Sequence, residues 1–124
     1  MKRITMMVLA AAFALGAATG VQAAAYSKCK ACHNFNEKNK VGPAWKGIFG
    51  RKAGTYPGFN YKFTKYITGE PWVWDEAHLR KWMCNSKKAV KEFTGNPKAK
   101  TKMPPQKVCD PKKQDEIIAF MKTL

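Results

Sequence analysis

The chain of 124 residues places Cys29, Cys32 and His33 in one Cys-x-x-Cys-His motif, and it has only one other histidine. Three chemistries use paired cysteines at this spacing: a redox dithiol, one half of a zinc site, and covalent attachment of haem. Each of them demands a different kind of protein around the motif. The motif therefore constrains the fold of this chain more than any other feature of its sequence.

The N-terminus has the order of a secretory signal peptide. Lys2 and Arg3 precede an apolar run over residues 6–18, and small residues follow it. The run is too short to span a bilayer comfortably. We expect cleavage after Ala23, with cleavage after Gly20 or an uncleaved short anchor as alternatives. Residues 1–23 are thus predicted to be a signal peptide, and residues 24–124 one exported domain with no transmembrane anchor.

The exported part of the chain is strongly basic. The sequence has 23 Lys and Arg against 8 Asp and Glu, and only Lys2 and Arg3 precede residue 24, which leaves 21 against 8 and a net charge of +13. Scattered lysines can simply form a solvated surface. They can also attract an acidic protein, an anionic membrane or nucleic acid. Export from the cytoplasm argues against nucleic acid.

The sequence favours helices joined by long loops. Residues 41–61 hold five glycines and two prolines without the alternation of a strand, so this segment is predicted to be an irregular loop. Asp75 and Asp110 are expected N-caps of two helices, the second with Pro111 at its first position. Shorter helices are expected over residues 25–32 and 63–67. The predicted class is all-α, with three to four short helices, and so much ordered loop needs something to wrap around.

Haem attachment accounts best for the motif. Cys84 and Cys109 are not closely paired and His78 stands alone, so a second half of a zinc site is missing. No strand–helix–strand pattern supports a redox dithiol. In haem attachment, by contrast, each thiol of the motif bonds to one vinyl group, and the next residue, His33, coordinates the iron.

The haem iron has a second axial position, and methionine sulfur is one group that fills it. Met83 and Met121 lie on apolar helix faces and are expected in the core. Met103 lies in the polar, proline-rich stretch KAKTKMPPQ and has no such explanation. It is the expected distal ligand. If this position were open instead, the protein could bind a gas or activate a peroxide.

The stretches KCKACH, VGPAWKGIFGRKAGTYPGFNY, VWDEAHL, TKMP and IIAFMKTL occur in this order. Together they resemble the class I cytochromes c over nearly all of residues 26–124. The resemblance implies a small cytochrome c fold around one covalently attached haem c. It also implies thioether bonds from Cys29 and Cys32, and axial bonds to the iron from His33 and Met103.

The resemblance implies further contacts around the haem. The carbonyl of Pro43 would accept a hydrogen bond from His33 Nδ1–H and fix the plane of the imidazole. The residues that match positions holding a haem propionate are Arg51, Tyr61 and Trp74, with Trp72 as a rival of Trp74. Tyr26 would pack against the C-terminal helix at Phe120 and Met121.

The chain departs from the family pattern in two places. Its N-terminal helix is short and lacks the usual small residue before the motif. Cys84 and Cys109 bracket the Met103 loop, and we predict a disulfide between them that holds Met103 on the iron, with two free thiols as the alternative.

An iron whose two axial positions are both filled has no site for a substrate. The expected function is therefore one-electron exchange, with no enzymatic activity. The protein would be a soluble, monomeric periplasmic carrier whose lysines around the haem edge meet acidic redox proteins. These lysines are Lys28, Lys40, Lys100 and Lys102. The alternatives are a haem subunit of a larger redox complex, or a ligand-binding or peroxidase haem protein in which Met103 does not ligate.

Overall fold

The structure is a computed structural model that describes residues 24–124, so the predicted signal peptide over residues 1–23 lies outside the described residues. The helical elements are η1 (Ala25–Ala31), η2 (Thr64–Tyr66), α1 (Glu76–Cys84), α2 (Ser86–Thr94) and α3 (Pro111–Lys122), of which η1 and η2 are 3₁₀ helices. Over residues 24–124 there is no strand, only an isolated antiparallel bridge between Lys52 and Val73. The all-α prediction is confirmed.

Helices α1 and α3 begin where their caps predict. The Asp75 side chain accepts a hydrogen bond from His78 N, and the Asp110 side chain accepts one from Lys112 N, with Pro111 as the first residue of α3. Each carboxylate satisfies an amide that the first turn leaves free. α1 buries Leu79, Trp82 and Met83 toward the interior, as its apolar spacing predicts.

Helix α2 was not predicted. Its ends follow ordinary capping chemistry: the Asn85 side chain accepts from Lys88 N, and Gly95 closes the helix with a left-handed φ of 65°. Only Ser86, Ala89 and Val90 are buried, so the apolar stripe is too short to stand out among the lysines. The structure therefore has one α-helix more than the sequence analysis expected.

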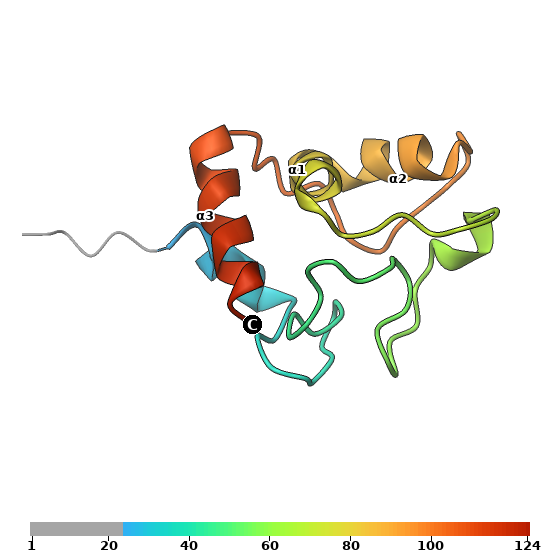
Figure 1. Cartoon of the computed structure of the whole chain (residues 1–124). Coiled ribbons are helices and arrows are strands. Elements are labelled where there is room, and N and C mark those ends of the chain that lie inside the picture. Colours follow the sequence, from blue (N-terminus) through green and yellow to red (C-terminus); the bar gives the residue numbers. More distant parts are fainter. Residues whose placement is uncertain (1–23) are drawn as a thin grey trace, which may run out of the picture.

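The terminal segments lie against one another at one end of the molecule (Figure 1). The ring of Tyr26 on η1 stacks on that of Phe120 on α3, with the centroids 3.7 Å apart and the planes 9° from parallel. The amide of Ala25 also donates to Glu116 Oε1 at 2.9 Å. The predicted packing of Tyr26 on Phe120 is confirmed, and an aromatic stack joins the termini where the chain lacks the usual small residue.

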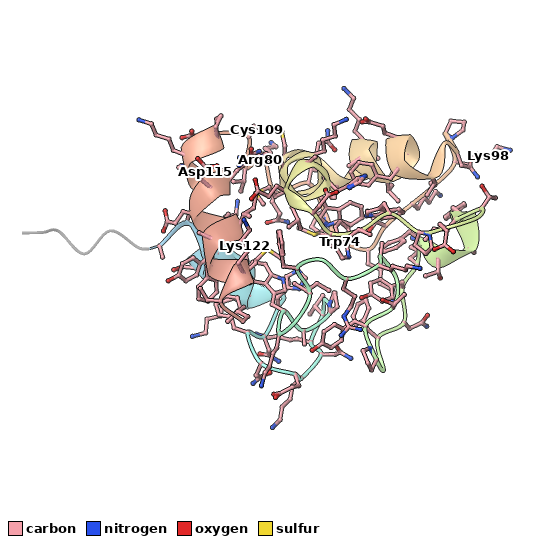
Figure 2. The ribbon with its side chains drawn as sticks, in the orientation of Figure 1. Trp74, Arg80, Lys98, Cys109, Asp115 and Lys122 are labelled. Atoms are coloured by element: carbon pink, nitrogen blue, oxygen red, sulfur yellow. A yellow bond between two sulfur atoms is a disulfide. The ribbon has the colours of Figure 1, made fainter. Side chains whose placement is uncertain are left out.

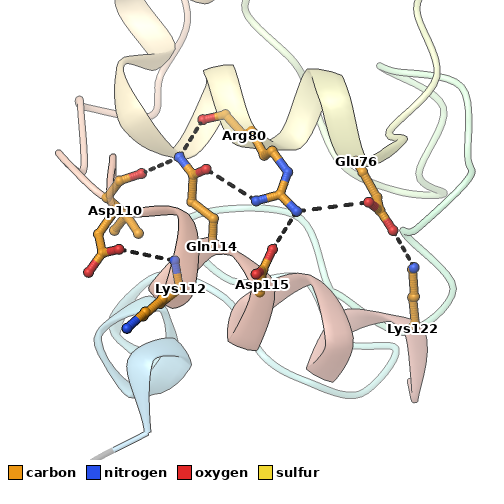
Figure 3. Close-up of polar contacts among 8 residues, drawn as sticks. Glu76, Arg80, Asp110, Lys112, Gln114, Asp115 and Lys122 are labelled. Atoms are coloured by element: carbon orange, nitrogen blue, oxygen red, sulfur yellow. Dashed lines mark hydrogen bonds and ion pairs between the residues drawn. The ribbon is translucent and has the colours of Figure 1, made fainter.

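Polar contacts join α1 to α3 (Figure 3). Arg80 contacts Asp115 at 2.5 Å and Glu76 at 3.9 Å. The buried Gln114 donates its amide protons to the carbonyl oxygens of Arg80, at 3.2 Å, and Val108, at 2.9 Å. Because Val108 follows the Met103 loop, this one side chain ties α3 both to α1 and to the end of that loop.

A disulfide joins Cys84, the last residue of α1, to Cys109, just before α3, with the Cα atoms 4.6 Å apart. Two backbone hydrogen bonds run beside it, from Lys107 N to the Cys84 carbonyl and from Val108 N to the Met83 carbonyl, each 3.1 Å long. The segment after Met103 is therefore fastened to the end of α1. In residues 24–124 we find no helix whose length and apolar character would let it cross a membrane.

Candidate haem site

The helices and loops enclose one large apolar cavity. Its walls come from η1, the loop over residues 41–63, α1, the Met103 loop and α3. Met83 and Met121, which the sequence placed in the core, are buried and line this cavity. The apolar faces of α1 and α3 thus line a pocket suited to a bulky apolar group.

One wall of the cavity carries the motif. The turn at the end of η1 brings the amides of Cys32 and His33 to the same acceptor, the carbonyl of Cys29, at 3.2 and 3.0 Å. Cys29, Cys32 and His33 all line the cavity. Cys29 and Cys32 are free, half-buried thiols. Burial raises the pKa of Cys29, and the charge of Lys28 partly opposes this.

His33 is buried, and its ring is held by a backbone carbonyl. Nδ1 lies 2.7 Å from the oxygen of Pro43, which can only accept, so Nδ1 carries the proton. Nε2 then has a free lone pair. Burial lowers the pKa of His33, and the bond to Pro43 partly opposes this. The imidazole is therefore kept neutral and oriented, as a metal ligand requires.

Gly42 makes this arrangement possible. A Cβ atom on Gly42 would lie 2.4 Å from Cε1 of His33, 2.7 Å from Nδ1 and 2.9 Å from Nε2. These distances are far below van der Waals contact. The backbone before Pro43 thus lies so close to the imidazole that only glycine fits beside it.

Met103 lines the same cavity from the loop after α2. Its sulfur accepts a hydrogen bond from Trp82 Nε1 at 3.0 Å, and its carbonyl accepts one from Ser86 Oγ at 2.7 Å. Neither Trp82 nor Ser86 was singled out from the sequence. Trp82 belongs to an apolar helix face and looked like a core residue, and the sequence carries no feature that would have marked Ser86.

The residues predicted to hold a propionate are not all at the cavity wall. Tyr61 and Trp74 line it, whereas Arg51 and Trp72 are not among the lining residues. Arg51 lies 5.0 Å over the ring of Tyr56, and its Nε is 3.4 Å from the Gly47 carbonyl. The roles of Arg51 and Trp74 toward a propionate, with Trp72 as the rival of Trp74, stay predictions. Trp74 lines the cavity, whereas the indole Nε1 of Trp72 is buried and makes no hydrogen bond within residues 24–124.

Tyr61 presents a polar atom without a partner. Its hydroxyl is buried and makes no hydrogen bond within the described residues. Burial raises the pKa of Tyr61 to about 12, opposed first by a contact with the backbone of Tyr56 and then by the charge of Arg51. A buried hydroxyl at a cavity wall is satisfied when the bound group brings an acceptor, such as a carboxylate oxygen.

Several lysines lie around the cavity mouth. Lys28 and Lys102 line it, and their ammonium groups donate to the carbonyls of Gln106, at 2.8 Å, and Asn60, at 2.6 Å. Lys40 is exposed and donates to the Lys30 carbonyl at 3.1 Å, and Lys100 is exposed. Two further side chains at the mouth were not predicted. They are Lys62, and Val41, which is 68% exposed.

The donor set fits haem c. One apolar cavity is lined by two thiols, an imidazole nitrogen and a thioether sulfur. The hydroxyl of Tyr61, which has no hydrogen-bond partner among the described residues, also lies at its wall. Histidine and methionine are the axial pair of electron-transferring c-type haems. Cys84 and Cys109 are bonded to one another, so they do not complete a zinc site with Cys29 and Cys32.

Comparisons with known proteins point to one family, although the chain matches no protein-family model. Cytochrome c2 of Agrobacterium tumefaciens (strain II Chrys) is 39% identical over 101 residues, covering 79% of this chain and 84% of the relative. Cytochrome c2 of Pararhodospirillum photometricum is 34% identical over 106 residues, and the match covers 81% of this chain and 90% of the relative.

Solved structures agree with this. Cytochrome cH from Methylobacterium extorquens is 41% identical with a TM-score of 0.62, and the match covers 81% of this chain and 92% of that one. Cytochrome c2 from Rhodobacter sphaeroides is 30% identical with a TM-score of 0.70, and the match covers 81% of this chain and 89% of that one.

Fold and site together define a small helical protein that wraps its loops around a covalently bound haem. This chain belongs to the class I cytochromes c. It is accordingly a c-type haem protein that carries single electrons between redox partners.

Proposed function

We propose that Cys29 and Cys32 hold the haem through thioether bonds and that His33 and Met103 are its axial ligands. The observation that carries this proposal is that all four side chains line one apolar cavity, although Met103 comes from a loop seventy residues away from His33. When bound, the haem supplies an iron that takes up and releases one electron. The protein supplies the oriented Nε2 of His33, the sulfur of Met103 and a dry cavity around them.

With both axial positions filled, the iron has no place for a substrate, and the proposed role is electron transfer without enzymatic activity. The predicted signal peptide, together with the cytochrome c2 relatives, supports a location in the periplasm. The disulfide between Cys84 and Cys109 is consistent with an oxidising compartment.

The proposed docking surface is the lysine-rich region around the cavity mouth, with Lys28 and Lys102 at the cavity wall and the exposed Lys40 and Lys100 as further members. Lys28 and Lys102 are already held by backbone carbonyls across the mouth, so part of the ring is ordered before a partner arrives. Its proposed partners are redox proteins with acidic docking surfaces, and the protein meets them as a monomer.

The carrier proposal is tested by the salt dependence of electron transfer with small charged reagents. Oxidation of the reduced protein by the anion ferricyanide should slow as ionic strength rises, because salt screens the attraction to the lysines. Oxidation by a cationic cobalt complex should accelerate under the same conditions. If both rates were independent of salt, electrons would not leave through the basic mouth.

A further inference from the structure

Ser86 makes a contact that the sequence does not explain. It is the first residue of α2 and is fully buried, with 0% of its surface exposed. Its hydroxyl donates to the backbone carbonyl of Met103 across 17 residues of sequence, at 2.7 Å. A buried polar side chain that reaches from a helix to a loop fixes the loop at that point.

The backbone at Met103 has little else to hold it. The two residues that follow, Pro104 and Pro105, have no amide proton to donate. Among the described residues, the amide of Met103 itself donates only to Thr101 Oγ1, at a long 3.4 Å. Trp82 holds the sulfur but not the main chain. The hydroxyl of Ser86 is therefore the group that ties the backbone of Met103 to a helix.

Ser86 is well placed to act as a fixed point. The preceding residue, Asn85, caps α2 through its bond from Lys88 N at 3.0 Å, and Val90, one turn further on, is fully buried. An ion pair between Lys81 and Glu92 holds α2 against α1. The hydroxyl of Ser86 is thus held in place by the cap and the buried face of α2.

We propose that Ser86 is a positioning residue that keeps the sulfur of Met103 on the haem iron by holding the Met103 carbonyl. This inference rests on the proposed axial role of Met103. In a Ser86→Ala variant the carbonyl loses its donor, so the loop swings away from the iron more often. Ser86→Thr retains the hydroxyl and should retain the function.

The test uses imidazole, which binds the ferric iron only in molecules whose Met103 has left it. Apparent affinity therefore reports the fraction of open molecules. We expect the haem-loaded Ser86→Ala protein to bind imidazole about tenfold more tightly than wild type, the fold-change that corresponds to about 1.4 kcal/mol. Ser86→Thr should bind within about twofold of wild type, well below that tenfold change.

Thr94→Val is the matched control. Thr94 lies at the other end of α2, and its hydroxyl also donates to a backbone carbonyl, that of Val90 at 2.7 Å, but within residues 24–124 it makes no hydrogen bond to Met103. Urea unfolding of both variants measures any general loss of stability. A positioning role predicts that only Ser86→Ala tightens imidazole binding, even where both variants lose stability equally.

Three results would overturn the inference, and they are distinguishable. If wild type shows a methionine–iron charge-transfer band and Ser86→Ala binds imidazole no more tightly than Thr94→Val, then Ser86 is merely a structural residue. If wild type lacks that band altogether, the axial role of Met103 fails and the inference fails with it. Ser86→Thr binding like Ser86→Ala would also contradict it, because the hydroxyl would then be irrelevant.

Discussion

Gly42 is the residue whose missing Cβ atom leaves room for the imidazole ring of His33. The carbonyl of Pro43 fixes the imidazole only because the chain before it passes the ring without a side chain. The motif alone identifies His33 as the ligand, but it contains no information about this neighbour. The orientation of the ring is set ten residues further along the chain.

We predict that Gly42→Ala displaces the His33 ring and lowers the free energy of unfolding by about 1–3 kcal/mol, the usual cost of overpacking. Haem attachment should fall as well. Pro43→Ala is the control, because it keeps the carbonyl that His33 uses and should behave nearly as wild type. Urea unfolding and the haem content of the purified protein measure both effects. Equal stability of the Gly42→Ala variant and wild type would contradict the close approach.

Tyr61 gives a prediction in the alkaline range. Burial raises its pKa from 10.0 to about 12, so the folded protein retains the phenol proton after the unfolded chain has lost it. Its contribution to stability is complete below pH 10 and is lost as the pH rises from 10 to 12. The phenolate absorbance of wild type minus that of Tyr61→Phe should titrate near pH 12. A midpoint near pH 10 would show that the ring is not buried.

At the scale of elements, the Met103 loop is the part that most needs support. Asn85, Gly95 and the disulfide define a segment that leaves α1, forms α2 and returns to the start of α3. Its return is held by backbone bonds to the carbonyls of Met83 and Cys84. The disulfide joins the two ends of this segment. We therefore expect it to affect both the stability of the fold and the position of Met103.

We predict that replacing both Cys84 and Cys109 with alanine lowers the free energy of unfolding by about 3 kcal/mol, from the chain-entropy relation for a loop of this length. The methionine–iron band should weaken, because the loop gains freedom. Chemical reduction of wild type should reproduce both changes. An unaltered band after reduction would leave the disulfide as a stabilising link with no effect on Met103.

The capping chemistry shows what could be predicted of these elements. Asp75 and Asp110 precede stripes of large apolar side chains, and both helices begin at the following residue. α2 has equally good caps in Asn85 and Gly95, but two of its three buried residues are the small Ser86 and Ala89, and it was not predicted. Local sequence predicts a helix well when capping and amphipathicity agree.

The candidate site divides in a similar way. Residues whose chemistry is local could be identified: the three of the motif, and Met103 because nothing else explained it. Gly42, Ser86 and Trp82 act through contacts across the fold, to residues 9, 17 and 21 positions away, which no local pattern encodes. The role of Arg51 toward a propionate rests on the resemblance alone and stays a prediction; its side chain lies over the ring of Tyr56.

On the scale of the whole molecule, the charge is unevenly neutralised. Each of the eight acidic side chains is engaged, by a basic side chain or by a backbone amide: Glu37, Glu70, Asp75, Glu76, Glu92, Asp110, Asp115 and Glu116. Lys28 and Lys102 at the cavity mouth instead donate to neutral carbonyls and keep their full charge for a partner. Figure 2 shows side chains extending outward along the outline of the molecule, with Lys98 and Lys122 well apart in the view. We therefore expect the positions of the lysines, and not the total charge alone, to select the docking surface.

We predict that Lys102→Glu slows oxidation by ferricyanide severalfold at low ionic strength, because it reverses a charge at the cavity mouth. Lys113→Glu is the matched control: it makes the same charge change on α3, at an exposed position outside the cavity lining, and should have a smaller effect. Both differences should shrink as salt is added. Equal effects of the two variants would show that only net charge matters.

His33 and Met103 are proposed to occupy both axial positions of the haem iron, from opposite walls of one cavity. The most direct test is a visible and near-infrared spectrum of the purified protein, oxidised and reduced, beside Met103→Ala and the control Met83→Leu. We predict a c-type reduced spectrum and a methionine-to-ferric-iron charge-transfer band that persists in Met83→Leu and disappears in Met103→Ala. A band absent from wild type, or one that survives in Met103→Ala, would contradict the account.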